Sequence, residues 1–228
     1  MDFFEAVERR RSVRRYTSKP VPPEVVERAI DAALLAPNSS NLQTWRFFWV
    51  RSPEKKAALV HACLSQGAAA TAQELLVVVA DRSLWKKTNA AILEIYRKAG
   101  GPKLAFDYYG KLIPLTYGWA ILSPLRWLVI QLIGLFRPIA RRPWSPGGVD
   151  EVAIKSAALA AENFMLAITA QGFDTCPMEG FDEFRVKKLL KLGCAARVVM
   201  VISVGERSEK GVWGQRVRFD RDWFVQKL

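Results

Sequence analysis

The sequence predicts one domain in which helices pack on a β-sheet, so its class is α/β or α+β. Helical and strand patterns interleave along the 228 residues, and 50% of those residues are hydrophobic, enough for one sizeable core. No internal repeat or low-complexity linker divides the chain. We therefore expect a single domain over residues 1–228.

The N-terminal half alternates helix and strand patterns. Phe3, Phe4 and Val7 recur at helical spacing, which predicts a short first helix. Proline suits the first turn of a helix, and a continuous apolar run suits a buried strand. These rules predict helices over residues 23–35, 53–64 and 89–99, and strands over residues 46–51 and 75–80.

The C-terminal half contains a long helical pattern over residues 150–171 whose surface is almost wholly apolar. Such a helix belongs at the centre of the fold or at a subunit interface. Beyond it the patterns predict a loop at 176–182, a helix at 183–192, a strand at 197–204, and a polar tail with an extended piece at 215–219.

The segment 112–136 is apolar apart from Arg126, and it includes Trp119, Ile121 and Leu122. Its length alone permits a membrane span, but Arg126 and two internal prolines argue against one. Residues 124–136 suit a single buried or interfacial helix with basic flanks. Three roles stay open, in this order: a lid or dimer contact, a membrane-surface helix, and a span.

Composition limits the chemistry. The formal charge of +12 favours anionic partners: a phosphorylated cofactor, nucleic acid or an anionic membrane. Three cysteines without C-x-x-C spacing argue against a disulfide framework or a cysteine zinc site, and no metal is expected. The single histidine, His61, argues against a histidine cluster. The N-terminus lacks the features of a secretory signal, which predicts a cytoplasmic protein.

Two basic clusters are candidate phosphate ligands. Arg10, Ser12 and Arg14 lie two apart, so in an extended stretch their side chains project to one side. Two guanidinium groups and a hydroxyl there would hold a phosphate, and Arg216 and Arg218 repeat the spacing. The alternatives are solvated charged faces or contacts with a nucleic-acid backbone, although no recognisable nucleic-acid motif accompanies them.

Two loops complete the candidate set. Residues 36–45 form a polar loop in which Ser39, Asn41 and Gln43 offer the donors and acceptors that an isoalloxazine ring needs. The alternative is ordinary turn chemistry. In the loop at 176–182, Pro177 and Gly180 bracket an acidic residue, and such a loop can aim backbone N–H groups at a ligand.

In this order, the four segments resemble those of the FMN-dependent nitroreductase family. That family has an Arg-x-Ser stretch, an Ala-Pro-Ser-x-x-Asn-x-Gln-Pro-Trp-like loop, a Pro-x-Glu-Gly loop and a basic-x-Arg pair; here Thr44 stands where a proline is common. The resemblance implies an α+β sandwich, with a mostly antiparallel sheet flanked by helices. It also implies an intertwined homodimer with FMN at the interface.

The resemblance implies an oxidoreductase that passes electrons from NADH or NADPH through FMN to a nitroaromatic, quinone or related apolar acceptor by ping-pong kinetics. No protein side chain is expected to be catalytic, and Glu179 would act through its backbone. An apolar insertion at about 103–147 would shape acceptor choice. The FMN contacts it implies are Arg10, Arg11, Ser12, Arg14, Pro37, Ser39, Asn41, Gln43, Gln66, Pro177, Met178, Glu179, Gly180, Arg216 and Arg218.

Two other functions stay open from the residues alone. A basic peripheral membrane protein could be anchored through residues 112–136, in which case the cytoplasmic protein would be membrane-associated. A charge-driven nucleic-acid binder is the other alternative, although we expect no nucleic-acid partner.

Overall fold

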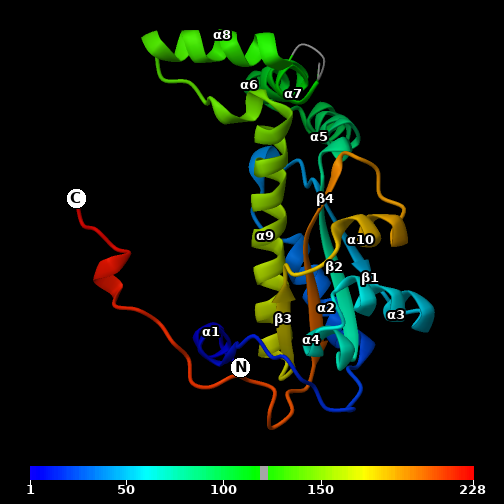
Figure 1. The fold of residues 1–228 in the computed structure, drawn as a ribbon. Helices are drawn as coiled ribbons and strands as arrows, with labels where there is room; N and C mark the ends of the chain where they lie inside the picture. Colours follow the sequence, from blue (N-terminus) through cyan, green and yellow to red (C-terminus); the bar gives the residue numbers. More distant parts are fainter. Residues whose placement is uncertain (119–122) are drawn as a thin grey trace.

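A four-stranded antiparallel sheet lies at the centre of the computed structural model, which describes residues 1–118 and 123–228 (Figure 1). Its order is β1-β2-β4-β3, and every neighbouring pair is antiparallel. The α+β expectation is confirmed. The strands are β1 (Trp45–Trp49), β2 (Glu74–Asp81), β3 (Asp174–Met178) and β4 (Ala196–Gly205).

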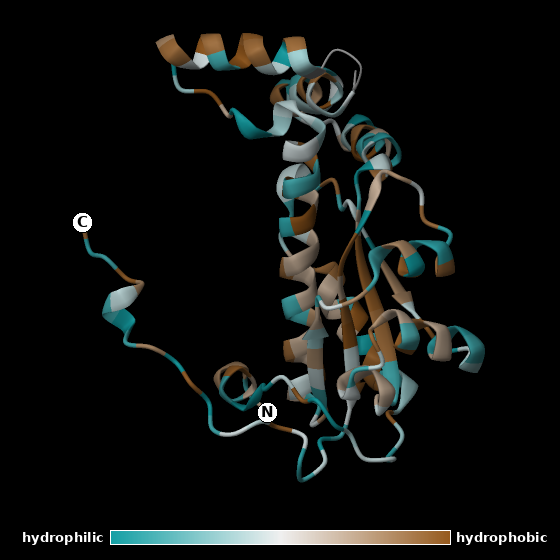
Figure 2. Cartoon of the chain, viewed as in Figure 1, coloured by the Kyte–Doolittle hydropathy of each residue, from teal (hydrophilic) through white to brown (hydrophobic). Residues whose placement is uncertain are grey.

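Both faces of the sheet are covered, which explains why its two central strands are continuous apolar runs. Leu76 and Val78 of β2 face one core, whereas Leu75, Val77 and Val79 face the other. Figure 2 shows these strands as a hydrophobic centre between two layers of helices.

The first core lies between the sheet, α2 (Pro23–Leu34) and α9 (Pro146–Ala170). Small residues on α9, including Ala157 and Ala160, are fully buried and let α2 approach closely. Within the described ranges, α9 is the one helix long and apolar enough to cross a membrane, but half of its most apolar stretch is buried inside the protein. It therefore lies in the core of this chain, which is one of the two positions that its pattern predicted.

The helix α9 begins one turn before its predicted start, because Ser145 caps it by accepting a hydrogen bond from the Gly148 N–H at 3.1 Å. The second core lies under α3 (Pro53–Ala62), α4 (Gly67–Ala70) and α10 (Glu183–Leu189). The four-residue helix α4 was not predicted, because it is too short for a helical period to appear.

One end of α9 carries a cap of helices, seen at the top of Figure 1. Its members are α5 (Trp85–Ala99), α6 (Lys103–Asp107), a π-helical turn (Tyr108–Leu112), α7 (Ile113–Tyr117) and α8 (Ser123–Phe136). The helix predicted over 124–136 is present as α8, but most of its large apolar side chains are exposed and not buried within this chain. The expected apolar residues Trp119, Ile121 and Leu122 lie outside the described residues.

The prediction of a loop over residues 176–182 is wrong for its first three positions. Cys176, Pro177 and Met178 belong to the edge strand β3, and only the stretch that follows is a loop. The Thr175 carbonyl points away from β4 and accepts from the Val13 N–H at 3.0 Å. Backbone groups two residues apart in a strand point to the same side, so the nitrogen of Pro177 also faces away from β4. Its missing N–H therefore costs the sheet no hydrogen bond.

The chain ends in a tail that leaves the body of the molecule after β4, near the N-terminal helix α1 (Phe3–Arg9) (Figure 1). The expected extended piece at 215–219 is not a strand of the described sheet. Several large apolar side chains of this tail are exposed: Trp213, Val217, Phe219, Trp223 and Phe224.

Candidate functional site

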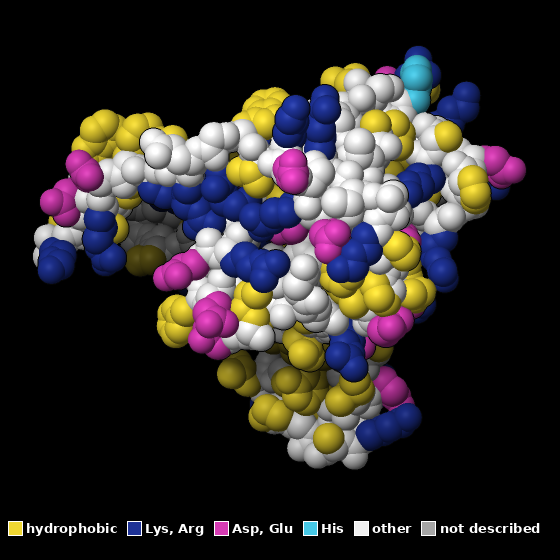
Figure 3. All heavy atoms as spheres, turned by 90° about the horizontal axis from the view of Figure 1, so that it is seen from below, with side chains coloured by type: hydrophobic (Ala, Val, Ile, Leu, Met, Phe, Trp, Pro, Cys, Tyr) yellow, Lys and Arg dark blue, Asp and Glu magenta, His cyan; other side chains and the backbone are white. Residues whose placement is uncertain are grey.

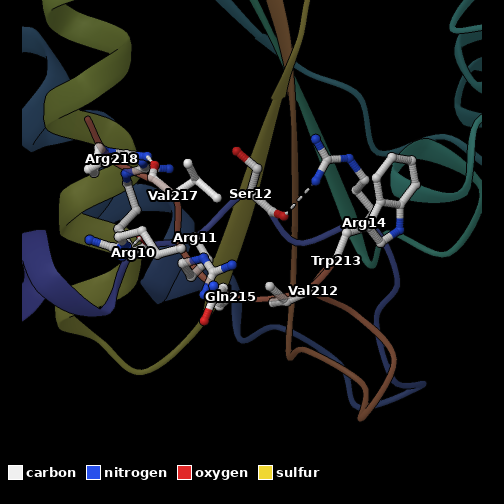
Figure 4. A pocket seen from close by; sticks show the side chains of 10 residues that line it. Arg10, Arg11, Ser12, Arg14, Val212, Trp213, Gln215, Val217 and Arg218 are labelled. Atoms are coloured by element: carbon white, nitrogen blue, oxygen red, sulfur yellow. Dashed lines mark hydrogen bonds between the residues drawn. The ribbon is translucent and has the colours of Figure 1, made fainter.

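A pocket of about 240 Å³ lies where the stretch after α1 meets the C-terminal tail. We call it the arginine pocket (Figure 4). Figure 3, seen from this end of the molecule, shows Lys and Arg side chains gathered on the surface. Its lining residues are Arg10, Arg11, Ser12, Arg14, Val212, Trp213, Gln215, Arg216, Val217 and Arg218.

Two backbone contacts hold the first wall of the arginine pocket in the extended form that the sequence predicts. Ser12 pairs with Thr175 of β3 as an isolated parallel bridge. Two residues later, the Arg14 N–H donates to the Gly211 carbonyl at 2.7 Å. The sheet edge and the tail thus fix the stretch on both sides, and Arg10, Ser12 and Arg14 all line one pocket.

The tail supplies the opposite wall. Arg216 Nη2 donates to the carbonyls of Glu8 and Arg10 at 2.5 and 2.6 Å, which ties the tail to the end of α1. Desolvation, followed by the charges of neighbouring arginines, lowers the pKa of Arg216. Arg11 also donates to the tail, at the Gly214 carbonyl (3.1 Å).

The arginine pocket is strongly cationic. Five guanidinium groups line it, and a carboxylate oxygen of Glu162 comes only within 3.9 Å of Arg10 Nε. Like charges packed this closely repel one another, so an anion in the pocket would relieve the repulsion. Trp213 was not among the predicted site residues. Its ring lies 4.3 Å from the Arg14 guanidinium carbon, and this cation–π contact fixes the Arg14 side chain.

Beside Arg14 lies the loop that follows β3. Gln66 Nε2 donates to the Gly180 carbonyl at 2.9 Å and to the Cys63 carbonyl at 3.1 Å. The next residue, Gly67, packs so tightly that an added Cβ would lie 2.9 Å from the Arg14 carbonyl oxygen. Gln66 and Gly67 therefore connect this loop to the edge of the arginine pocket.

The residues of this loop differ in what they can offer a ligand. The Met178 side chain is buried in the core, so only its backbone could reach a ligand, whereas Glu179 and Gly180 are exposed. Burial raises the pKa of the nearby Cys176 thiol, and the charges of Arg14 and Arg10 partly oppose that rise.

The polar loop after α2 presents its predicted side chains to solvent, because Pro37, Ser39, Asn41 and Gln43 are all exposed. Asn41 and Gln43 have φ angles of 52° and 47°, in the left-handed region. Non-glycine residues seldom adopt it, at a cost on the order of 1 kcal/mol each. Asn38 supports this backbone, because its Oδ1 accepts from the Gln43 N–H at 2.8 Å.

The helical cap holds the same loop from the other side. The hydroxyls of Ser40 and Tyr108 lie 2.6 Å apart, and Tyr109 donates to the Ser40 carbonyl at 3.1 Å. The loop is thus fixed against the π-helical turn, where it presents polar groups from a constrained backbone.

Within a single chain, this loop does not lie beside the arginine pocket. The loop contacts α9 at Ser156, whose Oγ accepts from the Ser39 N–H at 3.3 Å, whereas the pocket approaches α9 at Glu162. Six residues rotate a helix by about 240°, so the two contacts lie on different faces of α9. Among the described residues, those lining the pocket come only from the stretch after α1 and the tail.

Within residues 1–118 and 123–228, no group of three His, Cys, Asp or Glu side chains is arranged to hold a metal ion.

The chain is similar to several known proteins. The chain is 31% identical over 210 residues to Protein DrgA of Synechocystis sp., covering 92% of this chain and 86% of that protein. It is 27% identical to an NADH dehydrogenase of Thermus thermophilus, covering 97% and 94%.

Solved structures show the same fold. The crystal structure of ydfN from Bacillus subtilis superposes with a TM-score of 0.79 at 26% identity, covering 99% of this chain and 98% of that chain. The FMN complex of a protein from Exiguobacterium sibiricum gives a TM-score of 0.73 at 22% identity, covering 100% and 97%.

A family model spans the whole sheet, the first wall of the arginine pocket and both loops. It is the model of the Nitroreductase family, and it matches residues 7–206. With the relatives and the fold in agreement, the chain belongs to the nitroreductase family.

Proposed function

We propose that this protein is an FMN-dependent oxidoreductase that passes electrons from NADH or NADPH to a nitroaromatic, quinone or related apolar acceptor. The observation that carries the proposal is the arginine pocket, which is lined by five arginines and Ser12. The names of relatives agree with it, since one is an NADH dehydrogenase and one solved structure of the same fold contains FMN.

The arginine pocket fits the phosphate of FMN in both charge and shape. Guanidinium groups bind phosphate through paired hydrogen bonds, and Arg10, Arg14 and Arg218 approach the pocket from both walls. They line a small concave site, which suits a single phosphate monoester better than the extended backbone of a nucleic acid. We therefore propose no nucleic-acid partner.

The ring of FMN would need the two loops. The backbone of the Glu179–Gly180 loop can face the ring, because Gln66 fixes the Gly180 carbonyl and Glu179 itself is exposed. The exposed amides of Asn41 and Gln43 would contact the polar edge. When bound, FMN supplies the hydride chemistry between the nicotinamide and the acceptor.

The protein would therefore act as a homodimer. We call the polar loop after α2, residues 36–45, the Asn41 loop. In one chain this loop and the arginine pocket lie on different faces of α9, so a site that contains both must take the loop from a second copy. The exposed apolar residues of the tail also lack sufficient cover within one chain, as Trp223 and Phe224 are 68% and 70% exposed.

The acceptor would be a small apolar molecule. The helical cap holds the Asn41 loop through Tyr108 and Tyr109, and apolar side chains of α7 and α8 lie in the same cap. The residues of 103–147 would thus form an insertion that shapes acceptor choice beside the flavin ring.

A cytoplasmic location is consistent with this activity and stays a prediction. Contact with a membrane surface would accompany the oxidoreductase activity and not replace it.

The spectrum of the purified protein tests the proposed activity. We expect a yellow protein with flavin absorbance bands that bleach when NADH or NADPH is added without oxygen. An apolar quinone should restore the bands. Protein that neither carries flavin nor takes up added FMN would contradict the proposal.

A further inference from the structure

The helix α8 is exposed on most of its surface although nearly all of its residues are apolar. Leu132, Leu135 and Phe136 are 52%, 71% and 88% exposed. Figure 2 shows it as a hydrophobic rod standing out from the helical cap. An exposed apolar surface of this kind normally marks contact with another protein or with a membrane.

The charge around α8 distinguishes these partners. From Tyr108 to Val149 the sequence contains no aspartate or glutamate. The same stretch contains five basic residues: Lys111, Arg126, Arg137, Arg141 and Arg142. Lys111 and Arg142 pair with the flanking carboxylates of Asp107 and Glu151, and Arg126 donates to backbone carbonyls. Among the described residues, Arg137 and Arg141 therefore carry the unpaired positive charge next to α8. An apolar helix that ends beside two such arginines matches a surface with anionic headgroups over acyl chains.

Arg126 fixes α8 as a rigid platform. Its guanidinium donates to the carbonyls of Leu115 and Gly118 at 2.5 and 2.9 Å, at the end of α7, and to that of Trp144 at 3.5 Å. These contacts hold α8 to α7 and to the turn before α9, so its exposed face keeps one orientation relative to the core.

The dimensions of α8 exclude a span. Its 14 residues extend about 21 Å, short of the roughly 30 Å hydrocarbon core. A helix of this length can lie in the membrane plane instead. An open apolar groove of about 550 Å³ runs along it, lined by Leu115, Leu125, Arg126, Val129, Ile130, Ile133 and Trp144, and acyl chains could enter it.

We propose that α8 docks this protein on an anionic lipid bilayer, lying in the plane of the surface with Leu132, Leu135 and Phe136 among the acyl chains. Arg137 and Arg141 would then meet the headgroups. The helical cap also holds the Asn41 loop, so docking would bring acceptor-binding residues close to the bilayer, where apolar quinones partition. This last consequence rests on the proposed function, whereas the docking itself does not.

Vesicle co-sedimentation of the full-length protein tests the docking, with flavin content recorded by absorbance. Vesicles would contain phosphatidylcholine alone or with about one third phosphatidylglycerol. We expect binding to the anionic vesicles at least tenfold tighter than to the neutral ones. Equal or absent binding to both would overturn the proposal. Binding that persists in protein lacking flavin would separate docking from the proposed activity.

Two matched pairs of variants locate the surface. Leu135→Glu should weaken binding at least tenfold, whereas Phe184→Glu on the remote helix α10, where the side chain is 77% exposed, should not. Arg137→Glu should weaken it at least fivefold, whereas Lys188→Glu, with the same change in net charge, should not.

Equal effects within either pair would mean that the overall charge or general hydrophobicity drives binding, and would overturn the role of α8. The proposal would also be overturned if the wild type ignores vesicles and forms assemblies that Leu135→Glu disperses. In that case a second copy of the chain covers α8.

Discussion

At the scale of single residues, the arginines of the pocket have separable roles. Arg216 supports the structure, because it joins the tail to the carbonyls of Glu8 and Arg10. Arg218 donates only locally, to the adjacent Val217 carbonyl at 2.8 Å. Arg218 is therefore the better probe of cofactor binding, since its removal leaves the contacts between tail and α1 in place.

We expect Arg218→Ala to weaken FMN binding at least tenfold, because one charge-assisted hydrogen bond contributes about 1.5–3 kcal/mol. Arg10→Ala should have a similar effect. Quenching of flavin fluorescence on titration gives the dissociation constants. Arg97→Ala on α5, where the side chain pairs only with Glu94 at 3.6 Å, serves as the control. Unchanged affinity in both pocket variants would contradict the assignment.

Cys63 gives a pH dependence of stability. Its thiol is fully buried, and burial raises its pKa to about 11. In the unfolded chain the thiol has a pKa of about 8.5. At pH values between about 8.5 and 11 the unfolded chain therefore loses this proton while the folded chain keeps it, so the free energy of unfolding falls as the pH rises. By pH 10, about 1.5 units above the pKa of the unfolded thiol, the loss should be about 2 kcal/mol for this group.

Urea unfolding at pH 7.5 and pH 10 measures this loss. Cys63→Ala should lower stability at both values but show a smaller decrease between them. The exposed Cys194 provides the control, since Cys194→Ala should leave the decrease unchanged.

At the scale of elements, Arg126 links α8 to the rest of the helical cap. Its buried Nε has no hydrogen-bond partner, and desolvation lowers its pKa, so the stabilisation comes from the carbonyls that its Nη atoms meet. Arg126→Met keeps the apolar stem and removes those bonds. Local unfolding of α8 should then become more frequent.

Hydrogen exchange over residues 123–136 should become at least tenfold faster in Arg126→Met, while FMN binding stays unchanged. Arg137→Met removes a charge from the end of the same helix and should leave exchange near the wild-type rate. Equal protection in both variants would show that packing alone holds α8.

The elements that the sequence predicted well have strong local signals. Proline opens α2 and α3 at their predicted first residues, and β2 and β4 are apolar because both sheet faces are covered. The edge strand β3 was missed because Pro177, which has no N–H, indicates a turn unless its nitrogen is known to face away from the sheet. That direction depends on the pairing of Thr175, which is a long-range contact.

The candidate site was also predictable where the signal is local, and not where a position depends on long-range contacts. The spacing of Arg10, Ser12 and Arg14 predicted that they would share one side, since an extended chain alternates its side chains. Trp213 could not be predicted, because its position depends on where an irregular tail returns to the body. Nor does local sequence reveal that the Asn41 loop lies on a different face of α9 from the pocket.

At the scale of the whole molecule, a site shared between two chains has a testable signature. We expect a dimer of about twice the 25.7 kDa chain mass by light scattering. Arg218→Ala damages the pocket, and Asn41→Ala damages the loop. Each variant alone should bind FMN weakly at both sites.

Mixing equal amounts of these two variants should restore wild-type affinity at one site of each mixed dimer, which is about a quarter of all sites when the chains exchange freely. One site of the mixed dimer receives both damaged parts, and the other receives the intact pocket of one chain with the intact loop of its partner. If pocket and loop acted within one chain, mixing would restore none. A second mixture, of Arg218→Ala with Arg10→Ala, is the control, since both changes damage the pocket.

Pro177 has a further consequence for a chain emerging from the ribosome. The strands β2 and β4 are apolar enough to pair with copies of themselves before the fold is complete. Once β3 covers β4, the outer edge of β3 is met at Thr175 by the stretch after α1, and at Pro177 it lacks the N–H that a newly arriving strand would need. Growth of an aggregate by strand addition should stop at that edge, so the same residue that borders the proposed flavin site also protects the maturing sheet.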